Sequence, residues 1–414
     1  MSGRSTGALA AWVLLPLGVA SSHCSAESKS VSPLEATPAA VAQDGSAGAA
    51  AAPASVANDP DPVAEGNAAR TNEEITPTNL AAPPPMAPAD GETSAPPLAA
   101  PSVGDRCDVG VYDPAAPPQT LALSGSLGAH DPVIVAAGGR YHYFSTGSGI
   151  SVKSSPDLLS WTQETAVFPT TPAWFQQLVP AYAPRSIWAP DVSYFGGQYH
   201  LYYSVSSFGS NRSCIGHATR ADLDTGSWTD HEAMFCSNQP GQNDNYNAID
   251  PNVVLDQAGM PWLAFGSFWS GIKLIQLDLE GARAGTQLVS LASRGGGAIE
   301  GPFLVRRCGY YYLFVSFDAC CRGADSTYNL RVGRSTELLG PYVDKAGTSL
   351  LNGGGSLVLQ GGGDWAALGH NAILIEGTRA YNVYHAYAAS NGASQLRISE
   401  LVWDADGWPL SGGP

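Results

Sequence analysis

The chain has 414 residues and a formal net charge of −16 at pH 7. So acidic a protein repels the phosphates of nucleic acids and gains nothing from anionic membranes, which disfavours both as partners and leaves neutral or cationic ligands. The sequence has no phosphate-binding glycine loop, no paired CxxC zinc framework and no dinucleotide fingerprint, which argues weakly against nucleotide-dependent and zinc chemistry.

Residues 1–24 are predicted to form a secretory signal peptide. Arg4 supplies the positive charge, ALAAWVLLPLGVA is a short apolar core, and small residues follow. The core is too short for a good membrane span, so we expect none. Cys24 stands where a lipoprotein cysteine would stand, but SSHC lacks the usual leucine and small residue before it. We therefore expect a secreted or cell-surface protein, with a lipid anchor at Cys24 as an open alternative.

Residues 25–105 are rich in Ala, Pro, Ser, Asp and Glu and have almost no aromatic side chain, so they predict a disordered linker. The composition changes near Cys107. From there Trp, Tyr, Phe and β-branched residues are frequent and Gly recurs every few positions. Residues 106–414 are long enough for one domain with a large core, and we expect a monomer.

Five segments of this domain share one pattern, in which a polar residue precedes an apolar strand, a tight Gly turn and a Tyr-rich strand. They are HDPVIVAAGGRYHYFSTG, APDVSYFGGQYHLYYSVS, IDPNVVLDQAGMPWLAFGS, IEGPFLVRRCGYYYLFVS and GHNAILIEGTRAYNVYHAY. Third strands such as GISVKSS and NLRVGRS follow most of them, and fourth strands such as SWTDHEAMFC follow some. Helical periodicity is almost absent. The pattern predicts an all-β fold, a five-bladed β-propeller. A large sandwich or a β-solenoid is the alternative, but sandwich strands do not repeat a polar marker and solenoid periods are shorter.

The polar markers of the five repeats are Asp131, Asp191, Asp250, Glu300 and His370, spaced by 50 to 70 residues. Because the first strand of each propeller blade lines the central channel, markers in one register meet around the axis. Like charges held together raise one another's pKa values, and such clusters are commoner at functional sites than elsewhere.

Each marker also has a structural interpretation. Asp-Pro is an ordinary turn element, which leaves Asp131 and Asp250 open between the two readings. Asp191, in WAPD, fits a structural role best. Glu300 lies between Ile299 and Gly301 and has no turn role, so we interpret it as a half-buried acid with a raised pKa.

Two carboxyl groups with separated pKa values are the requirement of glycosidic bond cleavage, since one donates a proton and the other activates water or attacks carbon. Asp131, Asp250 and Glu300 supply such a set. Trp188, Phe208, Phe268 and Trp269 are predicted near the markers, where flat apolar faces stack on sugar rings. The aromatic pair in GSFWSG is the stronger signal, because two consecutive aromatics in a Ser/Gly turn cannot both point into a core.

At these residues the sequence resembles the endo-1,5-α-L-arabinanases of glycoside hydrolase family 43. The resemblance is carried by HDP, IWAPD, AIDP, FGSFWSGIKL, IEGP, YYYLFVSFDACCRGADSTY and GHN, and it runs from about residue 128 to the end. It implies a five-bladed propeller and an inverting enzyme that cleaves arabinan, the side chains of pectin. It also places the SFDACCRGADSTY string, where a buried strand ends, beside a sugar-binding cleft.

The resemblance implies roles residue by residue. Asp131 would be the general base, Glu300 the general acid, and Asp250 the residue that tunes and orients that acid. IEGP differs from the IEAP of many members by one methyl group beside the acid. Substrate contacts are implied for nine residues: Trp188, Phe208, Gly209, Asn247, Ala248, Ile249, Ser267, Phe268 and Trp269.

The resemblance also implies a calcium ion at His370 of GHN, held mostly through water. A lone histidine at the start of a strand is usually a hydrogen-bonding residue, and calcium prefers oxygen ligands. A metal carried largely by waters would fit so sparse a protein shell and would lower the pKa of nearby acids.

The cysteines fit an oxidising compartment. Cys214 opens a predicted third strand and Cys236 closes the fourth, so antiparallel pairing predicts a disulfide between them. Cys308 and Cys320 lie at opposite ends of one extended strand, too far apart to bond. Cys320 and Cys321 form a vicinal bridge or stay reduced, and the partner of Cys107 is open.

Three functions remain in view. The first is an exported inverting endo-arabinanase. The second is an exo-acting arabinofuranosidase or β-xylosidase of the same fold, which differs in the loops around the cleft. The third is a carbohydrate-binding propeller without catalysis, which the presence of all three carboxylates disfavours.

Overall fold

The computed structural model describes residues 106–182 and 186–414, all of which fall in one compact unit, Ala89–Pro414. The predicted signal peptide, Cys24 and the predicted linker lie outside the described residues. No helix within the described ranges has the length and apolar character needed to cross a membrane.

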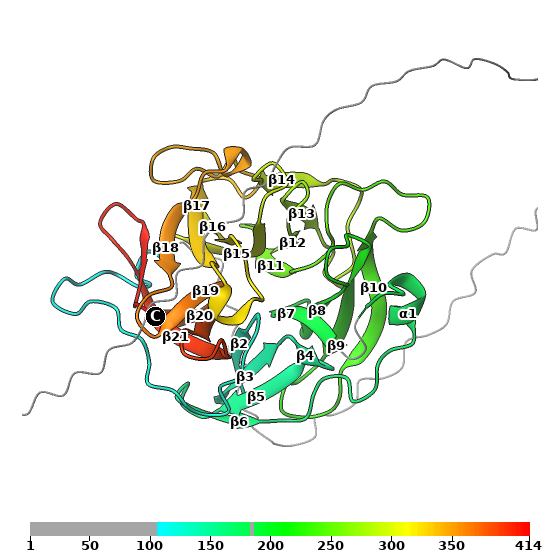
Figure 1. Ribbon diagram of the computed structural model, residues 1–414, viewed down its shortest axis with the longest axis horizontal. Coiled ribbons are helices and arrows are strands. Elements are labelled where there is room, and N and C mark those ends of the chain that lie inside the picture. The colour runs from blue at the N-terminus through cyan, green and yellow to red at the C-terminus, as the bar shows by residue number, and fades with distance from the viewer. Residues whose placement is uncertain (1–105, 183–185) are drawn as a thin grey trace, which may run out of the picture. The chain divides into compact units, whose positions relative to one another are not determined.

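The described residues form five sheets arranged radially around a central axis, which confirms the predicted five-bladed β-propeller (Figure 1). We number the sheets as blades one to five in chain order. Blade one consists of β2 (Val133–Ala137), β3 (Arg140–Ser145), β5 (Ser151–Ser155) and β6 (Ser160–Gln163). Blade two consists of β7 (Ser186–Phe195), β8 (Gln198–Val205), β9 (Ser213–Arg220) and β10 (Thr229–Ser237). Blade three consists of β11 (Asn252–Leu255), β12 (Pro261–Phe265), β13 (Ile272–Gln276) and β14 (Val289–Ala292). Blade four consists of β15 (Ile299–Arg307), β16 (Tyr310–Phe317), β17 (Asn329–Ser335) and β18 (Ser356–Gln360). Blade five consists of β19 (Trp365–Glu376), β20 (Arg379–Ala388), β21 (Ser394–Trp403) and β22 (Pro409–Ser411).

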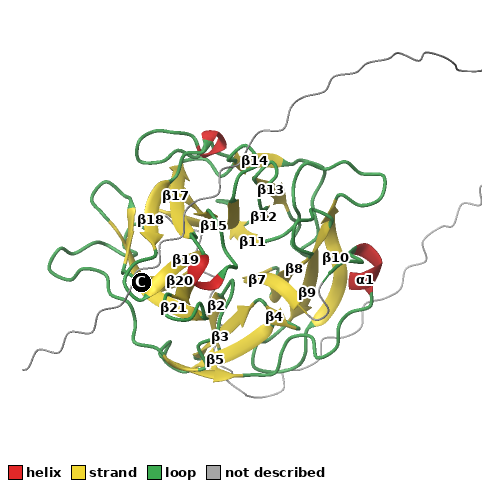
Figure 2. Cartoon of the chain, viewed as in Figure 1, coloured by secondary structure: helices red, strands yellow, loops and turns green. Residues whose placement is uncertain are grey.

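Short elements complete the fold, and loops connect the strands at both ends of the blades (Figure 2). Two short strands pair with the edges of the first two sheets, β1 (Ser124–Gly125) with β6 and β4 (Gly147–Ser148) with β7. The helical elements are α1 (Trp174–Leu178), η1 (Gly323–Asp325) and η2 (Leu350–Asn352). So little helix agrees with the lack of helical periodicity in the sequence.

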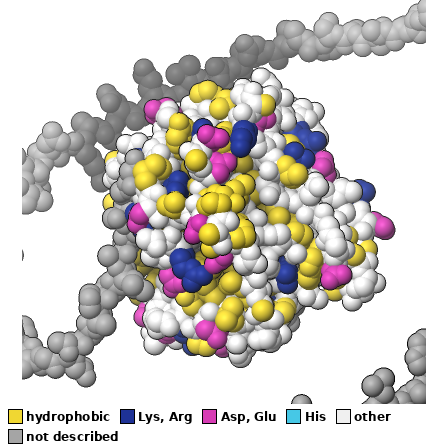
Figure 3. All heavy atoms as spheres, turned by 90° about the vertical axis from the view of Figure 1, so that its left-hand side faces the viewer, with side chains coloured by type: hydrophobic (Ala, Val, Ile, Leu, Met, Phe, Trp, Pro, Cys, Tyr) yellow, Lys and Arg dark blue, Asp and Glu magenta, His cyan; other side chains and the backbone are white. Residues whose placement is uncertain are grey.

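Apolar side chains fill the space between neighbouring blades. One buried cluster joins Trp262 of β12 to Leu304 of β15 and Tyr311 of β16, and so belongs to blades three and four together. The Tyr-rich β16 is almost wholly buried because both its faces pack. Packing against both neighbours holds each blade at a fixed place on the ring. On the side drawn in Figure 3, acidic and basic side chains are interspersed with apolar ones.

One residue of each blade, at or just before the inner strand, has a positive φ angle. These residues are Asp131 (51°), Ala189 (40°), Asp250 (58°), Gly301 (57°) and His370 (48°). In the β7, β15 and β19 strands the pairing register shifts at this point, as at a β-bulge. The repeat therefore places a backbone kink where the inner strand leaves the axis.

The positions of these kinks show that the sequence pattern aligned the five repeats incorrectly in two blades. The counterpart of Asp131 in blade two is Ala189, not Asp191, and the counterpart in blade four is Gly301, not Glu300. Positive φ explains the glycine in IEGP, because glycine adopts this conformation at no steric cost. A Cβ at residue 301 would also lie 3.1 Å from the ring of His370.

The kinked residues are hydrogen-bonded to the preceding blade. The backbone N–H groups of Ala189, Asp250 and His370 donate to the hydroxyls of Thr146, Ser204 and Ser316 at 2.7, 2.9 and 2.8 Å. The N–H of Asp131 donates to His385 Nδ1 of blade five at 3.1 Å, and that of Gly301 donates to Asp250 Oδ2 at 3.1 Å. These bonds connect all five blades around the axis.

The N-terminal segment 106–129 joins blade five to blade one. It bridges to β21 at Thr120 and Gly128, and between these points its strand β1 pairs in parallel with β6. The short β22 is the outer strand of blade five.

The described residues contain three disulfides. Cys214–Cys236 joins the start of β9 to the end of β10, as predicted. Cys107–Cys308 ties the N-terminal segment to the β15–β16 turn and supplies the partner of Cys107 that the sequence left open. Cys320 and Cys321 are bonded to each other, which decides between the two alternatives.

Candidate active site

A cavity of about 990 Å³ opens at the axis and receives residues from all five blades. We call it the cleft. Asp131, Asp250, Glu300 and His370 all line it, so the markers with proposed chemistry do meet at one place. Asp191 is not among the lining residues. Its buried carboxylate accepts the N–H of Val253 at 2.9 Å and the side chain of Asn252 at 3.3 Å, which confirms its structural role.

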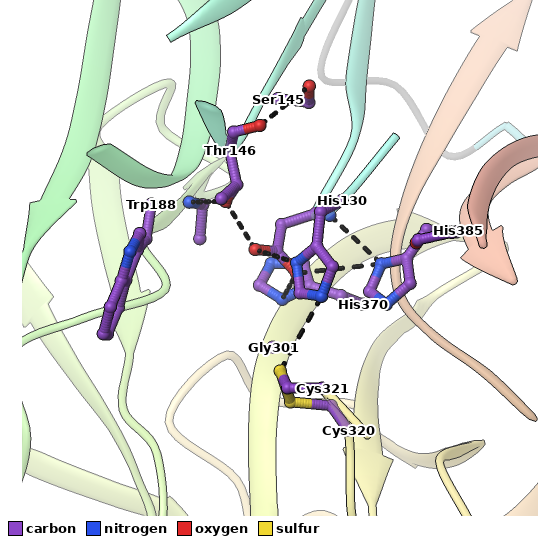
Figure 4. Close-up of polar contacts among 12 residues, drawn as sticks. His130, Ser145, Thr146, Trp188, Gly301, Cys320, Cys321, His370 and His385 are labelled. Atoms are coloured by element: carbon purple, nitrogen blue, oxygen red, sulfur yellow. Dashed lines mark hydrogen bonds and ion pairs between the residues drawn. A yellow bond between two sulfur atoms is a disulfide. The ribbon is translucent and has the colours of Figure 1, made fainter. Parts of the chain in front are cut away.

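Asp131 is held as a carboxylate by two histidines. Its Oδ2 lies 2.9 Å from His130 Nδ1 and its Oδ1 lies 3.1 Å from His370 Nδ1, and the hydroxyl of Thr146 donates to Oδ2 at 2.5 Å. Burial opposes ionisation here, yet the two imidazoles outweigh it and hold the pKa of Asp131 well below its usual range. Figure 4 shows His130 and His370 close together, with His385 beside them.

Glu300 experiences the opposite balance. Burial raises the pKa of Glu300, and the negative charge of Asp131 adds to the rise. Ser267 Oγ donates to Oε2 at 2.8 Å, which favours the ionised form but does not cancel the burial. Glu300 therefore has a raised pKa, as predicted, and is suited to donate a proton.

Asp250 lies between these two environments. Burial, together with the charges of Glu300 and Asp131, raises the pKa of Asp250 to about 7, although His370 and the N–H of Gly301 act in the other direction. His370 takes up positive charge in response. Burial would lower the pKa of His370, but Asp131, Asp250 and Glu300 raise it to about 9.

Aromatic side chains from blades two and three form one side of the cleft. Trp188 and Phe208 are 4.9 Å apart between ring centroids, and Phe208 is 79% exposed. Phe268 and Trp269 both line the cleft, as expected for the GSFWSG turn, and both have positive φ. Strained backbone of this kind is commonest where function requires it.

The remaining predicted substrate contacts divide into two groups. Gly209, Asn247, Ile249 and Ser267 line the cleft. The buried side-chain oxygen of Asn247 has no hydrogen-bond partner among the described residues, so it is free to accept a hydroxyl of a ligand. Ala248 does not line the cleft. It is fully buried in a core cluster, because the residue between Asn247 and Ile249 points to the opposite side of the chain.

Sequence reasoning missed the support around Asp131. His130 lines the cleft, stacks on His385 with ring centroids 4.1 Å apart, and places Nε2 2.7 Å from the hydroxyl of Tyr387. In the sequence, the one sign of this support was the histidine directly before Asp131 in HDP. The segment after β16 also reaches the cleft, through Ala319, Cys320, Cys321 and Arg322, which agrees with the prediction that this string lies beside it.

Comparison with known proteins identifies the family. Residues 125–409 match the profile of Glycosyl hydrolases family 43. The chain belongs to this family. It is 44% identical over 287 residues to the extracellular endo-alpha-(1->5)-L-arabinanase 1 of Bacillus subtilis, covering 68% of this chain and 86% of the relative. It is 40% identical over 298 residues to the extracellular exo-alpha-(1->5)-L-arabinofuranosidase ArbA of Cellvibrio japonicus, covering 68% of this chain and 85% of the relative.

Solved structures agree with this assignment. A family 43 endo-arabinanase from Bacillus licheniformis is 45% identical, with a TM-score of 0.65, covering 70% of this chain and 99% of that one. An alpha-L-arabinanase from Cellvibrio cellulosa, complexed with arabinohexaose, is 39% identical, with a TM-score of 0.66, covering 69% of this chain and 96% of that one. This family 43 glycosyl hydrolase therefore shares its fold with both solved structures, one of which is complexed with arabinohexaose.

Proposed function

We propose that this chain hydrolyses α-1,5-L-arabinofuranosidic linkages inside arabinan, with inversion at the anomeric carbon. The observation that carries the proposal is the split among the cleft carboxyls, in which the pKa of Asp131 is held low and the pKa of Glu300 is raised. Two carboxyls with opposite shifts are what acid and base roles at one bond require. Relatives named for arabinan cleavage support the substrate.

In this mechanism Asp131 removes a proton from a water molecule, which attacks the anomeric carbon of the sugar. Glu300 donates its proton to the departing glycosidic oxygen as the C–O bond breaks. Asp250 tunes and orients the acid in this mechanism: its carboxyl interacts with the charge of Glu300 and accepts the N–H of the neighbouring Gly301. The aromatic side chains Trp188, Phe208, Phe268 and Trp269 supply apolar faces for the sugar rings, and Asn247 accepts a sugar hydroxyl.

Product analysis tests the function. Purified protein is incubated with debranched arabinan and the products are separated over time. Endo action gives short oligosaccharides first, whereas release of arabinose alone would make the chain exo-acting, as the name of the 40% identical Cellvibrio japonicus relative describes. The anomeric form of the first product, followed by NMR, tests inversion. The absence of any cleavage would leave the non-catalytic, sugar-binding alternative.

We also propose that His370 holds a calcium ion, largely through water. His370 Nδ1 faces Asp131, so Nε2 is the ring atom left for a ligand, and three acids nearby favour a cation. Binding at Nε2 requires the neutral ring, so the metal would displace the proton that these acids otherwise hold there. A single nitrogen is a sparse shell for calcium, which would keep waters as its other ligands and supply positive charge beside the acids. The test is metal analysis before and after chelation, with the melting temperature as a second measurement. A metal-free protein with unchanged stability, and no calcium-dependent rise in its melting temperature, would contradict this proposal.

Export of the protein is the matching proposal for location. The Bacillus subtilis and Cellvibrio japonicus relatives both carry the word extracellular in their names, and three disulfides within the described residues suit an oxidising compartment. Fractionation of the native producing cells, followed by mass spectrometry of the mature N-terminus, would locate the protein and show whether Cys24 is retained.

A further inference from the structure

The bonded pair Cys320–Cys321 lies in the wall of the cleft. Cys320 packs against a buried cluster that includes Tyr328 and Tyr387, whereas Cys321 is exposed, and both line the cleft. The Sγ of Cys321 is 3.7 Å from His130 Nε2, and the other nitrogen of that ring contacts Asp131 at 2.9 Å. The sulfur surface is therefore one side chain away from the proposed general base (Figure 4).

The pair is fixed in place from several directions. The N–H of Cys321 donates to the hydroxyl of Tyr387 in blade five at 3.0 Å. At the start of the segment, Asp318 pairs with Arg294 at 2.9 Å, and the N–H of Ala319 donates to Thr327 at 3.1 Å. These bonds hold the wall across blades four and five.

Stabilisation of the fold does not explain this disulfide. A disulfide stabilises a fold mainly by restricting the conformations of the unfolded chain, and this stabilisation grows with the length of the loop that the bond closes. Cys320 and Cys321 are separated by one position, so the bond removes almost no chain freedom. The other two disulfides close 201 and 22 positions. A nucleophilic role is also excluded, because a bonded sulfur is not a thiolate.

What the bond does provide is a small rigid surface without hydrogen-bond donors. Sulfur is polarizable and packs well against apolar groups. Each face of an arabinofuranosyl ring carries ring C–H groups beside its oxygens, and the C5 methylene group adds apolar surface to one face. In the same cleft, aromatic rings from blades two and three offer such a surface on other walls.

We propose that the Cys320–Cys321 disulfide is a substrate-contacting wall, against which ring C–H groups of an arabinofuranosyl unit beside the scissile bond pack. This inference rests on the proposed function. It assigns to the bonded cysteines a role in sugar binding, and it makes Tyr387 a positioning residue that holds Cys321 against the cleft.

The test measures binding apart from catalysis. Calorimetry gives the Kd of arabinohexaose in a Glu300→Gln background, alone and combined with Cys320→Ala/Cys321→Ala. We expect the Kd to rise about five- to tenfold when the sulfur wall is lost. The matched control is Cys107→Ala/Cys308→Ala, which removes a disulfide outside the cleft and should lower the melting temperature without changing the Kd.

A second variant guards against a backbone effect. Residue 321 has φ of 67°, which glycine adopts freely, so Cys320→Ala/Cys321→Gly removes the sulfurs without strain and should lose the same affinity. An unchanged Kd in either folded variant, or failure of both variants to fold, overturns the inference. If the Glu300→Gln parent does not bind arabinohexaose and the wild type does not cleave arabinan, the proposed function fails first, so the two failures are distinguishable.

Discussion

Asp131 and Glu300 are both buried carboxyls, yet their surroundings move their pKa values in opposite directions. Asp131 has two imidazoles within 3.1 Å. Glu300 has a hydroxyl donor at 2.8 Å, and this donor, Tyr328 and the charge of His370 together do not offset the effect of burial on its pKa. Burial disfavours the ionised form of both carboxyls. The neighbours therefore decide which carboxyl holds the proton.

Replacing Glu300 by Gln tests its role as the acid. Glutamine keeps the size of the side chain but cannot donate a proton to a leaving oxygen. We expect kcat on arabinan to fall about a thousandfold, the size typical of a lost general acid, while the Kd for arabino-oligosaccharides stays close to that of the wild type. Steady-state kinetics and calorimetry measure the two quantities. Undiminished turnover would remove Glu300 as the acid.

The pH dependence of kcat/KM should respond to the neighbours of Glu300 in opposite senses. The acid must be protonated, so activity falls as the pH rises through the raised pKa of Glu300. Ser267→Ala removes a donor that favours the ionised form, so the basic limb should move to higher pH. Asp250→Asn removes a nearby negative charge, so the same limb should move down. Shifts in the same direction would contradict this account.

At the level of the strands, the inner ends of neighbouring blades are joined by side chains that accept backbone N–H groups. Asp191, two positions beyond the kinked residue Ala189, links neighbouring blades in the same way. Its two oxygens accept from Val253 and Asn252, and Asn252 Oδ1 in turn accepts the N–H of Leu304 at 2.8 Å. Three blades are thus linked through consecutive buried polar groups.

Replacing Asp191 by Asn should cost stability without removing the chemistry. An amide places an NH₂ group against one of the two donors, which leaves a buried donor unsatisfied at a cost of about 1 to 3 kcal/mol. Urea unfolding measures the loss. Glu280→Gln is the control, since this exposed carboxylate should change the unfolding free energy by less than about 0.5 kcal/mol. Equal stability of the two variants would contradict the structural role.

The repeats were predictable because they rest on local pattern, namely an apolar strand, a Gly turn and a Tyr-rich strand. The register of the markers was predicted correctly at Asp131, Asp250 and His370, but not in blades two and four. There the kinked position holds Ala189 or Gly301, and neither residue type signals chemistry. A pattern based on acids therefore selected their neighbours.

Contacts between distant segments were beyond the sequence. Ala248 was predicted to contact substrate because its neighbours in AIDP were. The direction of its side chain depends on the loop conformation, which places it in the core. The support of Asp131 by His385 and Tyr387 comes from blade five, more than 250 positions away. Only the closure of the ring brings these side chains to the acid.

At the scale of the whole molecule, the ring is closed by the segment that precedes blade one. Leu121 and Glu400 donate their N–H groups to Ile398 and Gln119 at 2.8 Å each, and β1 continues onto β6 of blade one. The N–H bond from Asp131 to His385 closes the same gap at the axis. The proposed base therefore sits at the seam of the ring.

Loss of the Cys107–Cys308 disulfide should weaken this seam. The bond closes a loop of 201 positions, so removing it frees much of the unfolded chain, at a cost of about 2 to 5 kcal/mol. Guanidinium unfolding of Cys107→Ala/Cys308→Ala measures the change. A midpoint equal to that of the wild type would show that the N-terminal segment is held by its other contacts alone.

The separation of Cys107 from Cys308 also orders events during biosynthesis. Cys214 and Cys236 are 22 positions apart and can be oxidised as soon as blade two emerges. Cys107 must wait for residue 308, and it is unprotected against Cys214 and Cys236 in the meantime. In an oxidising compartment, correct pairing would require slow oxidation, or an isomerase, so that the Cys107 thiol is kept from the wrong partner until Cys308 has been made.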